Sequence, residues 1–448
     1  MGKIFGTDGV RGKANVKLTP ELAFNLGRAA ATVLIRNKRG AKSKIIIGKD
    51  TRISGDMLEA ALAAGICATG AQAVLLGVIP TPGVAMLCRH LGSDAGVVIS
   101  ASHNHFADNG IKFFSGDGYK LSDAVEEEIE YFLQNSEEIP RALAGDIGSI
   151  KTLSGAARLY TQLLKEAQPV DLTGLKLVVD PANGAAFAVA APLLRELGAG
   201  VTEICHEPDG CNINDGCGST HPQLLQQEVL AKQADLGIAL DGDADRLVVV
   251  DERGELVDGD EILAVCAAAL KRRGRLKNDL LVMTVMSNMG LSLAMEKIDV
   301  KTVTTKVGDR YVLEKMQELG AVLGGEQSGH IIFSEYNTTG DGLASALFLL
   351  SVLVESKKPL SELTKVIKRL PQVLVNVPVN KKEDWEADAD IREVYERACA
   401  VLEGQGRILL RPSGTEQLIR VMLEGPDLEK LQQLSADLAQ VLTEKRGL

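Results

Sequence analysis

The chain has 448 residues, of which 45% are hydrophobic, and a formal net charge of −11. One hydrophobic core rarely supports this length, so we expect three or four domains. The negative charge and the 4% aromatic content exclude a nucleic-acid binder, which needs a basic surface and stacking side chains, while 45 glycines favour an α/β protein with many turns.

The sequence carries no pattern typical of secretion or membrane insertion. Its first residues lack the apolar segment of a signal peptide, and the longest apolar stretch, residues 343–354, is too short to span a bilayer and predicts a core helix. The seven cysteines are an odd number without a CxxC pair, which is typical of reduced thiols. We therefore expect a cytoplasmic protein with no membrane partner.

Three parts of the chain repeat one order of elements: an apolar strand, a turn of small residues, a helix and a second strand. The first strands are at residues 45–47, 177–179 and 281–283, the helices near 56–69, 188–197 and 290–297, and the second strands at 73–76, 201–204 and 300–303. Apolar strands that alternate with helices indicate strands covered on both faces, and hence layered α/β domains.

Each copy continues with another apolar strand that ends in a polar loop. These strands are residues 96–99, 236–240 and 321–323, and their loops are residues 100–104, 241–246 and 324–330. Ligands of such sheets collect outside the carboxyl ends of the strands, so we expect the three loops to face one cleft.

The last part of the chain has a different pattern of predicted strands and helices. Strand-like segments at residues 373–377, 407–410 and 418–423, with helices around 390–402 and from 428, predict a small α+β domain with an antiparallel sheet. The predicted fold is therefore three similar layered α/β domains with mixed sheets around a central cleft, plus a C-terminal α+β domain. The predicted domains are residues 1–152, 153–254, 255–370 and 371–448.

Asp241, Asp243 and Asp245 alternate directly after the apolar residues 236–240. Three like charges this close are unfavourable without a cation among them, and hard oxygen ligands select Mg²⁺, Ca²⁺ or Mn²⁺ rather than Zn²⁺. An EF-hand loop begins with the same pattern, but Arg246 occupies its sixth position, where the turn needs Gly. A metal loop is the favoured interpretation, and a solvated acidic turn is the alternative.

Ser102 follows the strand at residues 96–99, where a side chain can point into a cleft. Loop serines more often cap turns, and no Gly-x-Ser-x-Gly segment supports a serine hydrolase here. Pairing with a metal loop favours phosphoryl chemistry instead.

The segment RPSGTE at residues 411–416 has the composition of a phosphate-binding loop. A guanidinium grips two phosphate oxygens, hydroxyls donate, and Gly lets backbone N–H groups approach closely. An ordinary turn is the alternative. The candidate phosphate ligands are Arg411, Ser413, Gly414 and Thr415, with Arg420 on the following strand.

Together with the segment GTDGVRG at residues 6–12, these motifs resemble the α-phosphohexomutase superfamily over essentially the whole chain. The resemblance implies a resting phosphoserine at Ser102 and one Mg²⁺ per chain, held by that phosphate with Asp241, Asp243 and Asp245. It also implies that the phosphoryl group passes to O1 of a 6-phosphorylated sugar. The resulting 1,6-bisphosphate turns around and returns its 6-phosphate to Ser102.

The same resemblance implies roles for other side chains. Lys112 and His330 align with proposed general acid/base helpers, although Lys112 alternatively only neutralises phosphate and His330 only caps a buried turn. Arg11 and Arg246 are expected near the phosphoserine, and Arg411 with its neighbours is expected to hold the phosphate that is not reacting. The expected readers of sugar hydroxyls are Glu326 and Ser328. The chain has His105 where the family commonly has Pro, which should loosen that loop slightly.

The form GEQSGH of residues 325–330 favours an amino-sugar substrate by resemblance. We expect interconversion of glucosamine 6-phosphate and glucosamine 1-phosphate through glucosamine 1,6-bisphosphate, feeding UDP-N-acetylglucosamine and cell-wall precursor synthesis. The alternative is a phosphomannomutase or phosphoglucomutase acting on a neutral hexose. A noncatalytic sugar-phosphate sensor and a metal-dependent phosphatase are alternatives of other classes. The resemblance also suggests a homodimer.

Overall fold

The computed structural model describes residues 4–6, 8–35, 43–413 and 416–447. The chain divides into two compact units, Met1–Met286 with Asp299–Val366, and Ser287–Ile298 with Ile367–Leu448. Gly414 and Thr415, two of the predicted phosphate ligands, lie outside the described residues. Among the helices that the structure describes, none is both long and apolar enough to cross a membrane.

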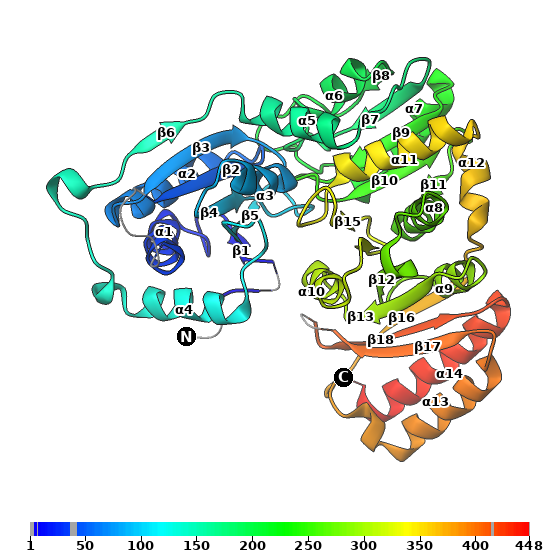
Figure 1. The fold of residues 1–448 in the computed structure, drawn as a ribbon. Helices are drawn as coiled ribbons and strands as arrows, with labels where there is room; N and C mark the ends of the chain where they lie inside the picture. Colours follow the sequence, from blue (N-terminus) through cyan, green and yellow to red (C-terminus); the bar gives the residue numbers. More distant parts are fainter. Residues whose placement is uncertain (1–3, 7, 36–42, 414–415, 448) are drawn as a thin grey trace. The chain divides into compact units, whose positions relative to one another are not determined.

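The first sheet has six strands in the order β1-β5-β4-β2-β3-β6 (Figure 1). β5 pairs antiparallel with both β1 and β4, and the other pairs are parallel. The strands are β1 (Val10–Lys13), β2 (Lys44–Lys49), β3 (Gln72–Val78), β4 (Ala95–Ile99), β5 (Asp108–Ser115) and β6 (Ile150–Thr152), and the helices are α1 (Pro20–Leu34), α2 (Gly55–Ala68), α3 (Thr81–His90) and α4 (Asp123–Gln134).

The second sheet has the order β11-β10-β9-β7-β8. Its strands are β7 (Lys176–Asp180), β8 (Gly200–Glu203), β9 (Leu236–Leu240), β10 (Leu247–Asp251) and β11 (Leu256–Val257), with helices α6 (Ala190–Glu196) and α7 (Gln223–Lys232). The preceding helix α5 (Ala156–Ala167) packs against α3 and β3 of the first sheet. β9 and β10 are buried along their whole length, which explains their unbroken apolar sequence.

The third sheet has the order β13-β12-β14-β15. Its strands are β12 (Leu280–Thr284), β13 (Lys301–Thr305), β14 (Leu323–Gly325) and β15 (Ile331–Phe333), with α8 (Gly259–Arg272), α10 (Asp309–Leu319), α11 (Gly342–Ser356) and the short α12 (Leu360–Leu363). The predicted core helix is confirmed, because α11 is buried along most of its length and packs against α8, β10 and β15.

The three sheets share one arrangement of four neighbouring strands, in the orders β5-β4-β2-β3, β10-β9-β7-β8 and β15-β14-β12-β13. In each, the second and third strands are parallel and the first is antiparallel to the second. The predicted threefold repeat of mixed α/β layers is therefore confirmed. The polar loops predicted to carry the chemistry follow the equivalent strands β4, β9 and β14.

The second compact unit contains a three-stranded antiparallel sheet in the order β16-β18-β17, as predicted for the C-terminal part. Its elements are β16 (Gln372–Pro378), β17 (Arg407–Pro412), β18 (Leu418–Glu424), α9 (Met289–Glu296), α13 (Ala389–Leu402) and α14 (Leu428–Arg446). Helices α13 and α14 cover the same face of this sheet (Figure 1). The short 3-10 helices of the chain are η1 (Ser136–Glu138), η2 (Ala144–Asp146), η3 (Gly218–Thr220), η4 (Lys277–Asp279), η5 (Thr364–Val366) and η6 (Trp385–Ala387).

Candidate active site

Ser102 lies in the loop after β4 and is only 2% exposed. Its backbone is in the left-handed region, with φ of 54°, which a residue other than Gly adopts only when its surroundings hold it there. Its N–H donates to Ser100 Oγ at 3.0 Å, and its carbonyl oxygen accepts from Arg52 Nη2 and Asn214 Nδ2, each at 2.9 Å. These hydrogen bonds hold the backbone of Ser102 in place and thereby position its side chain. Its Oγ donates to Asp241 Oδ2 at 2.5 Å.

Asp241, Asp243 and Asp245 form a buried cluster in the loop after β9, each at most 5% exposed. One ligand oxygen from each lies within 4.8 Å of the others. The loop approaches Ser102 closely because Gly242 has no side chain: a Cβ there would lie 2.6 Å from the Ser102 carbonyl oxygen. The structure thus brings the predicted metal ligands and the predicted phosphoserine together.

The charges of this cluster fit a bound cation. Burial, Asp245 and Asp243 together raise the pKa of Asp241 well above its usual value, because three carboxylates this close repel each other. Asp243 Oδ1 and Asp245 Oδ1 are buried, and no described residue donates a hydrogen bond to either. Carboxylate oxygens with free lone pairs are suitable ligands for a hard divalent cation, so the cluster can bind a metal ion.

Lys112, on β5, is buried beside this cluster, 2% exposed. Its Nζ donates to Asp243 Oδ2 at 2.8 Å and lies 2.9 Å from Asp8 Oδ2. Burial alone would raise the pKa of Asp243, but the Lys112 charge and the hydrogen bonds from Lys112 and Thr81 together lower that pKa. Arg11, on β1, pairs with the same Asp8. Two predicted cations on strands of the first sheet, Lys112 and Arg11, therefore help to neutralise the acidic cluster.

His330 and Arg246 also lie beside the cluster, where an isolated β-bridge joins their backbones. Arg246 N–H donates to Asp241 Oδ1 at 3.2 Å, and the Arg246 guanidinium lies 4.0 Å from Asp245. The His330 ring is 3.6 Å from Asp245 and 3.5 Å from Asp309. Burial lowers the pKa of His330, but these two carboxylates raise it to about 9. The Gly340 N–H donates to His330 Nε2 at 3.1 Å. Because a nitrogen that accepts a hydrogen bond carries no proton, this contact favours the neutral ring and opposes the effect of the two carboxylates.

The sequence did not single out Lys120, which links these side chains. Lys120 Nζ donates to Asp8 Oδ1 at 2.5 Å and also to Asp309, and so connects the first sheet to α10. Asp8, Lys112 and Lys120 line one narrow pocket with Arg310. Asp8 belongs to the quoted segment 6–12, and the family resemblance places residues 306–310, which include Asp309, near the site, but no local pattern distinguishes Lys120 from a solvated charge.

Glu326 and Ser328 lie in the turn between β14 and β15 that ends at His330. Glu326 Oε1 accepts from the Gly308 N–H at 3.0 Å, while Ser328 is exposed. The Gly329 carbonyl oxygen of this turn accepts from Leu247 N–H at 2.9 Å, directly after the aspartate loop. The predicted sugar readers are therefore placed in the turn next to the acidic cluster.

The remaining predicted ligands belong to the second compact unit. Arg411 on β17 pairs in register with Arg420 on β18. Burial and the neighbouring Arg420 lower the pKa of Arg411, since two cations on adjacent strands repel each other. Ser413 is buried, and its Oγ accepts from Glu416 N–H at 3.2 Å. Two adjacent guanidiniums next to a serine are chemically suited to an anion.

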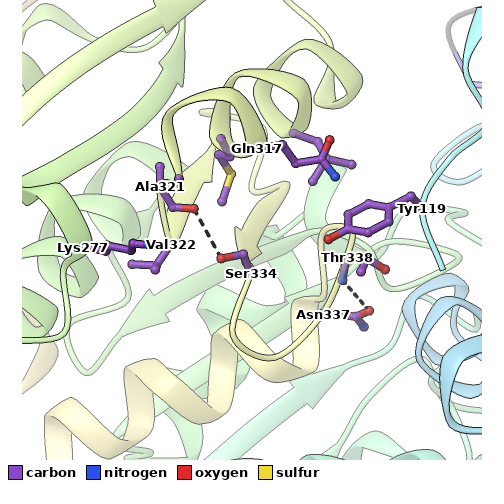
Figure 2. A pocket seen from close by; sticks show the side chains of 11 residues that line it. Tyr119, Lys277, Gln317, Ala321, Val322, Ser334, Asn337 and Thr338 are labelled. Atoms are coloured by element: carbon purple, nitrogen blue, oxygen red, sulfur yellow. Dashed lines mark hydrogen bonds between the residues drawn. The ribbon is translucent and has the colours of Figure 1, made fainter. Parts of the chain in front are cut away.

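A different pocket lies beside α10 and the β14–β15 hairpin (Figure 2). Tyr119, Gln317, Ser334 and Thr338 are among its lining residues, and none of the predicted site residues lines it. Ser334 Oγ already donates to the Ala321 carbonyl oxygen at 3.3 Å, and Thr338 N–H donates to Asn337 at 2.9 Å. This pocket is thus separate from the candidate active site.

Comparison with known proteins identifies the family. Models of phosphoglucomutase/phosphomannomutase domains match in order: alpha/beta/alpha domain I at residues 2–140, domain II at 158–254, domain III at 258–370 and the C-terminal domain at 374–441. Proteins named phosphoglucosamine mutase from Heliobacterium modesticaldum and Desulforamulus reducens are each 55% identical to this chain. The first alignment covers 98% of this chain and 99% of the relative, and the second covers 99% of each.

Solved structures agree on the fold. A phosphoglucomutase/phosphomannomutase family protein from Burkholderia thailandensis superposes with a TM-score of 0.81 at 24% identity, covering 99% of this chain and 97% of its own. Aspergillus fumigatus N-acetylphosphoglucosamine mutase, in complex with GlcNAc-6P and magnesium, gives 0.67 at 17% identity, covering 98% and 95%. The resemblance noted in the sequence is confirmed. The chain belongs to the phosphoglucomutase/phosphomannomutase family of the α-phosphohexomutase superfamily, which are isomerases, and its relatives in that family include the phosphoglucosamine mutases.

Proposed function

We propose that this protein interconverts glucosamine 6-phosphate and glucosamine 1-phosphate by passing a phosphoryl group through Ser102. The observation that carries the proposal is the hydrogen bond from Ser102 Oγ to Asp241 Oδ2, at the edge of a buried acidic cluster that can bind a metal ion. The 55% identity to proteins named phosphoglucosamine mutase supports the choice of substrate.

The reaction proceeds in two balanced halves. First, O1 of glucosamine 6-phosphate attacks the phosphorus of phosphorylated Ser102, so that the P–Oγ bond breaks and a P–O1 bond forms. The O1 hydroxyl loses its proton and the serine oxygen gains one. After the glucosamine 1,6-bisphosphate turns around, Ser102 Oγ attacks the phosphorus on O6, so that the P–O6 bond breaks and a P–Oγ bond forms. Ser102 Oγ loses its proton, O6 gains one, and glucosamine 1-phosphate is released.

Ser102, Asp241, Asp243 and Asp245 would hold Mg²⁺, which neutralises charge on the transferring phosphoryl group. Around them, Arg11 and Arg246 supply fixed positive charge, and Lys112 and His330 are the candidates for moving the two protons. Glu326 and Ser328 bind the sugar hydroxyls. The phosphate that is not reacting binds to Arg411, Ser413, Gly414, Thr415 and Arg420.

We further propose that each chain binds one Mg²⁺ and that glucosamine 1,6-bisphosphate is the intermediate. We also propose that the protein is cytoplasmic and forms a homodimer. The buried carboxylates are suited to any hard divalent cation, and the family resemblance favours Mg²⁺. The homodimer rests on that resemblance alone.

Turnover of four sugar phosphates followed by ³¹P NMR tests the proposal. Phosphorylated enzyme with Mg²⁺ is incubated separately with glucosamine 6-phosphate, glucosamine 1-phosphate, glucose 1-phosphate and mannose 1-phosphate. We expect the fastest isomerisation with the glucosamine phosphates and little free phosphate. Equal or faster turnover of mannose phosphate would show that the substrate is a neutral hexose. Predominant release of free phosphate would show that the protein is a phosphatase, and binding without turnover would show that it is a sensor.

A further inference from the structure

Asp180, Cys205 and Cys217 form a second cluster of metal-ligating side chains in the second sheet. A carboxylate oxygen and the two Sγ atoms all lie within 4.8 Å of one another. They come from three separate segments: Asp180 ends β7, Cys205 follows β8, and Cys217 precedes η3. The cluster contains none of the residues assigned to phosphoryl transfer.

Backbone hydrogen bonds hold these residues in place. Asp180 Oδ1 accepts from Ala182 N–H and Asp180 Oδ2 from Gly218 N–H, each at 2.8 Å. The Cys205 carbonyl oxygen accepts from Asn183 N–H at 2.7 Å. Cys205 has φ of 48°, a left-handed conformation that costs free energy in a residue other than Gly. Each carboxylate oxygen keeps a further lone pair, so these bonds orient Asp180 without blocking a ligand.

The cluster also carries a buried charge without a cation. Asp180 is 0% exposed, and no ion pair joins it to a lysine, arginine or histidine in the described part of the chain. Burial accordingly raises the pKa of Asp180 to about 6. Cys217 is 1% exposed; it shares a hydrogen bond with the Cys205 side chain, and its Sγ also accepts a long contact of 3.9 Å from Asn183 Nδ2. Cys205 is partly exposed and leaves a route to solvent.

We propose that Asp180, Cys205 and Cys217 bind a thiophilic divalent cation of the Zn²⁺ class, as a site distinct from the oxygen-lined aspartate cluster. Two sulfurs and one carboxylate oxygen are a ligand set that favours Zn²⁺ over Mg²⁺. A tetrahedral Zn²⁺ places sulfur and oxygen ligands about 3.6–3.8 Å apart, so the three ligands need shifts of only about 1 Å. Water would fill the fourth position. Binding releases the thiol protons and places two thiolates and one carboxylate on the cation.

A metal at this site would stabilise the segment that contacts the Ser102 loop. The segment between Cys205 and Cys217 carries Asn214, whose Nδ2 donates to the Ser102 carbonyl oxygen at 2.9 Å and to the Asn104 carbonyl oxygen at 3.2 Å. Asn214 N–H in turn donates to the Ala182 carbonyl oxygen at 2.9 Å. Joining β7, β8 and this loop through one cation therefore stabilises the support of the Ser102 loop, and the melting temperature should rise with metal concentration.

Titration with Co²⁺ tests the site independently of isomerase activity. Reduced full-length protein is titrated with Co²⁺ in saturating Mg²⁺, and the thiolate-to-cobalt charge-transfer absorption is recorded. Cobalt bound only by oxygen ligands lacks this absorption, so the aspartate cluster contributes nothing to it. We expect one equivalent of Co²⁺ to produce the band and Zn²⁺ to remove it. Absence of the band in the unaltered protein would overturn the proposal.

Variants assign the band to the cluster. Cys205→Ser and Cys217→Ser should each weaken Co²⁺ binding more than tenfold, and Asp180→Asn should weaken it while leaving thiolate absorption. Cys211→Ser is the matched control, because Cys211 lies in the same loop but is exposed, and it should bind normally. A band that persists in both Cys205→Ser and Cys217→Ser would refute the assignment.

A labelling experiment on the unaltered protein covers the case in which those variants fail to fold. Zn²⁺ should slow alkylation of the partly exposed Cys205 at least tenfold while the exposed Cys211 reacts at its original rate. Equal rates with and without Zn²⁺ would contradict the proposal.

Discussion

Ser102 Oγ donates a hydrogen bond of 2.5 Å to Asp241 Oδ2 across 139 residues of sequence. The bond joins the loop after β4 to the loop after β9, two equivalent positions in the repeated sheets. It places the Ser102 hydroxyl beside three carboxylates whose mutual repulsion a bound cation would relieve.

Ser102→Ala should reduce kcat at least about 10³-fold, because the oxygen that would carry the phosphoryl group is removed. The lost hydrogen bond to Asp241 should cost only about 1 kcal/mol of stability. Coupled assays of glucosamine 1-phosphate formation and thermal melting measure both effects. Ser334→Ala is the matched control, since Ser334 lines the separate pocket, and its turnover should be unchanged. Substantial turnover by Ser102→Ala would exclude a phosphoserine pathway.

Asp243→Asn should raise the Mg²⁺ concentration needed for half-maximal activity at least about tenfold. The substitution removes one negative oxygen ligand and the charge that faces Lys112. Titration of activity with Mg²⁺ after treatment with chelator measures the change. Asp251→Asn, at the end of β10 and outside the cluster, should retain the normal Mg²⁺ dependence. Full activity of the unaltered protein in chelator would contradict a metal at the aspartates.

Lys120→Met should lower the melting temperature strongly, because it leaves Asp8 and Asp309 without the ammonium between them. Breaking a buried ion pair by removing one partner costs about 3–5 kcal/mol. Lys277→Met, at an exposed lysine, should have little effect. The double variant Lys120→Met with Asp309→Asn should be less destabilised than the sum of the single variants. Additive effects would show that the two side chains do not interact in solution.

The cysteines should differ sharply in alkylation at pH 8. Burial together with Asp94 and Asp117 raises the pKa of Cys88 to about 12, so almost none of this thiol is present as the reactive thiolate. Cys211 is exposed. Peptide mapping after brief iodoacetamide treatment should find Cys211 modified and Cys88 intact, with both modified after unfolding. Rapid modification of native Cys88 would contradict its buried position on α3.

Local patterns in the sequence predicted the features that depend on neighbouring residues. The apolar runs at residues 236–240 and 96–99 became the buried strands β9 and β4, and the aspartates and Ser102 followed them as expected. The strand-like alternation of side chains at residues 373–377 likewise predicted the antiparallel C-terminal sheet. These features are encoded by side-chain periodicity within short segments.

Features that depend on tertiary pairing were not predictable in the same way. Lys120 contacts Asp309 across 189 residues, and Thr81 donates to Asp243 at 2.7 Å across 162 residues. Nothing near Lys120 or Thr81 in the sequence distinguishes them from surface residues. Helix α9 was predicted at nearly its observed position, but its membership of the second compact unit depends on contacts with residues beyond 366.

Transfer of a labelled phosphoryl group from Ser102 tests the central claim most directly. The protein is labelled with ³²P at Ser102, freed of excess label and mixed with glucosamine 6-phosphate and Mg²⁺ in a single turnover. The account predicts that the label leaves the protein and appears in glucosamine 1,6-bisphosphate and glucosamine phosphates. Label that stays on the protein, or leaves only as inorganic phosphate, would contradict it.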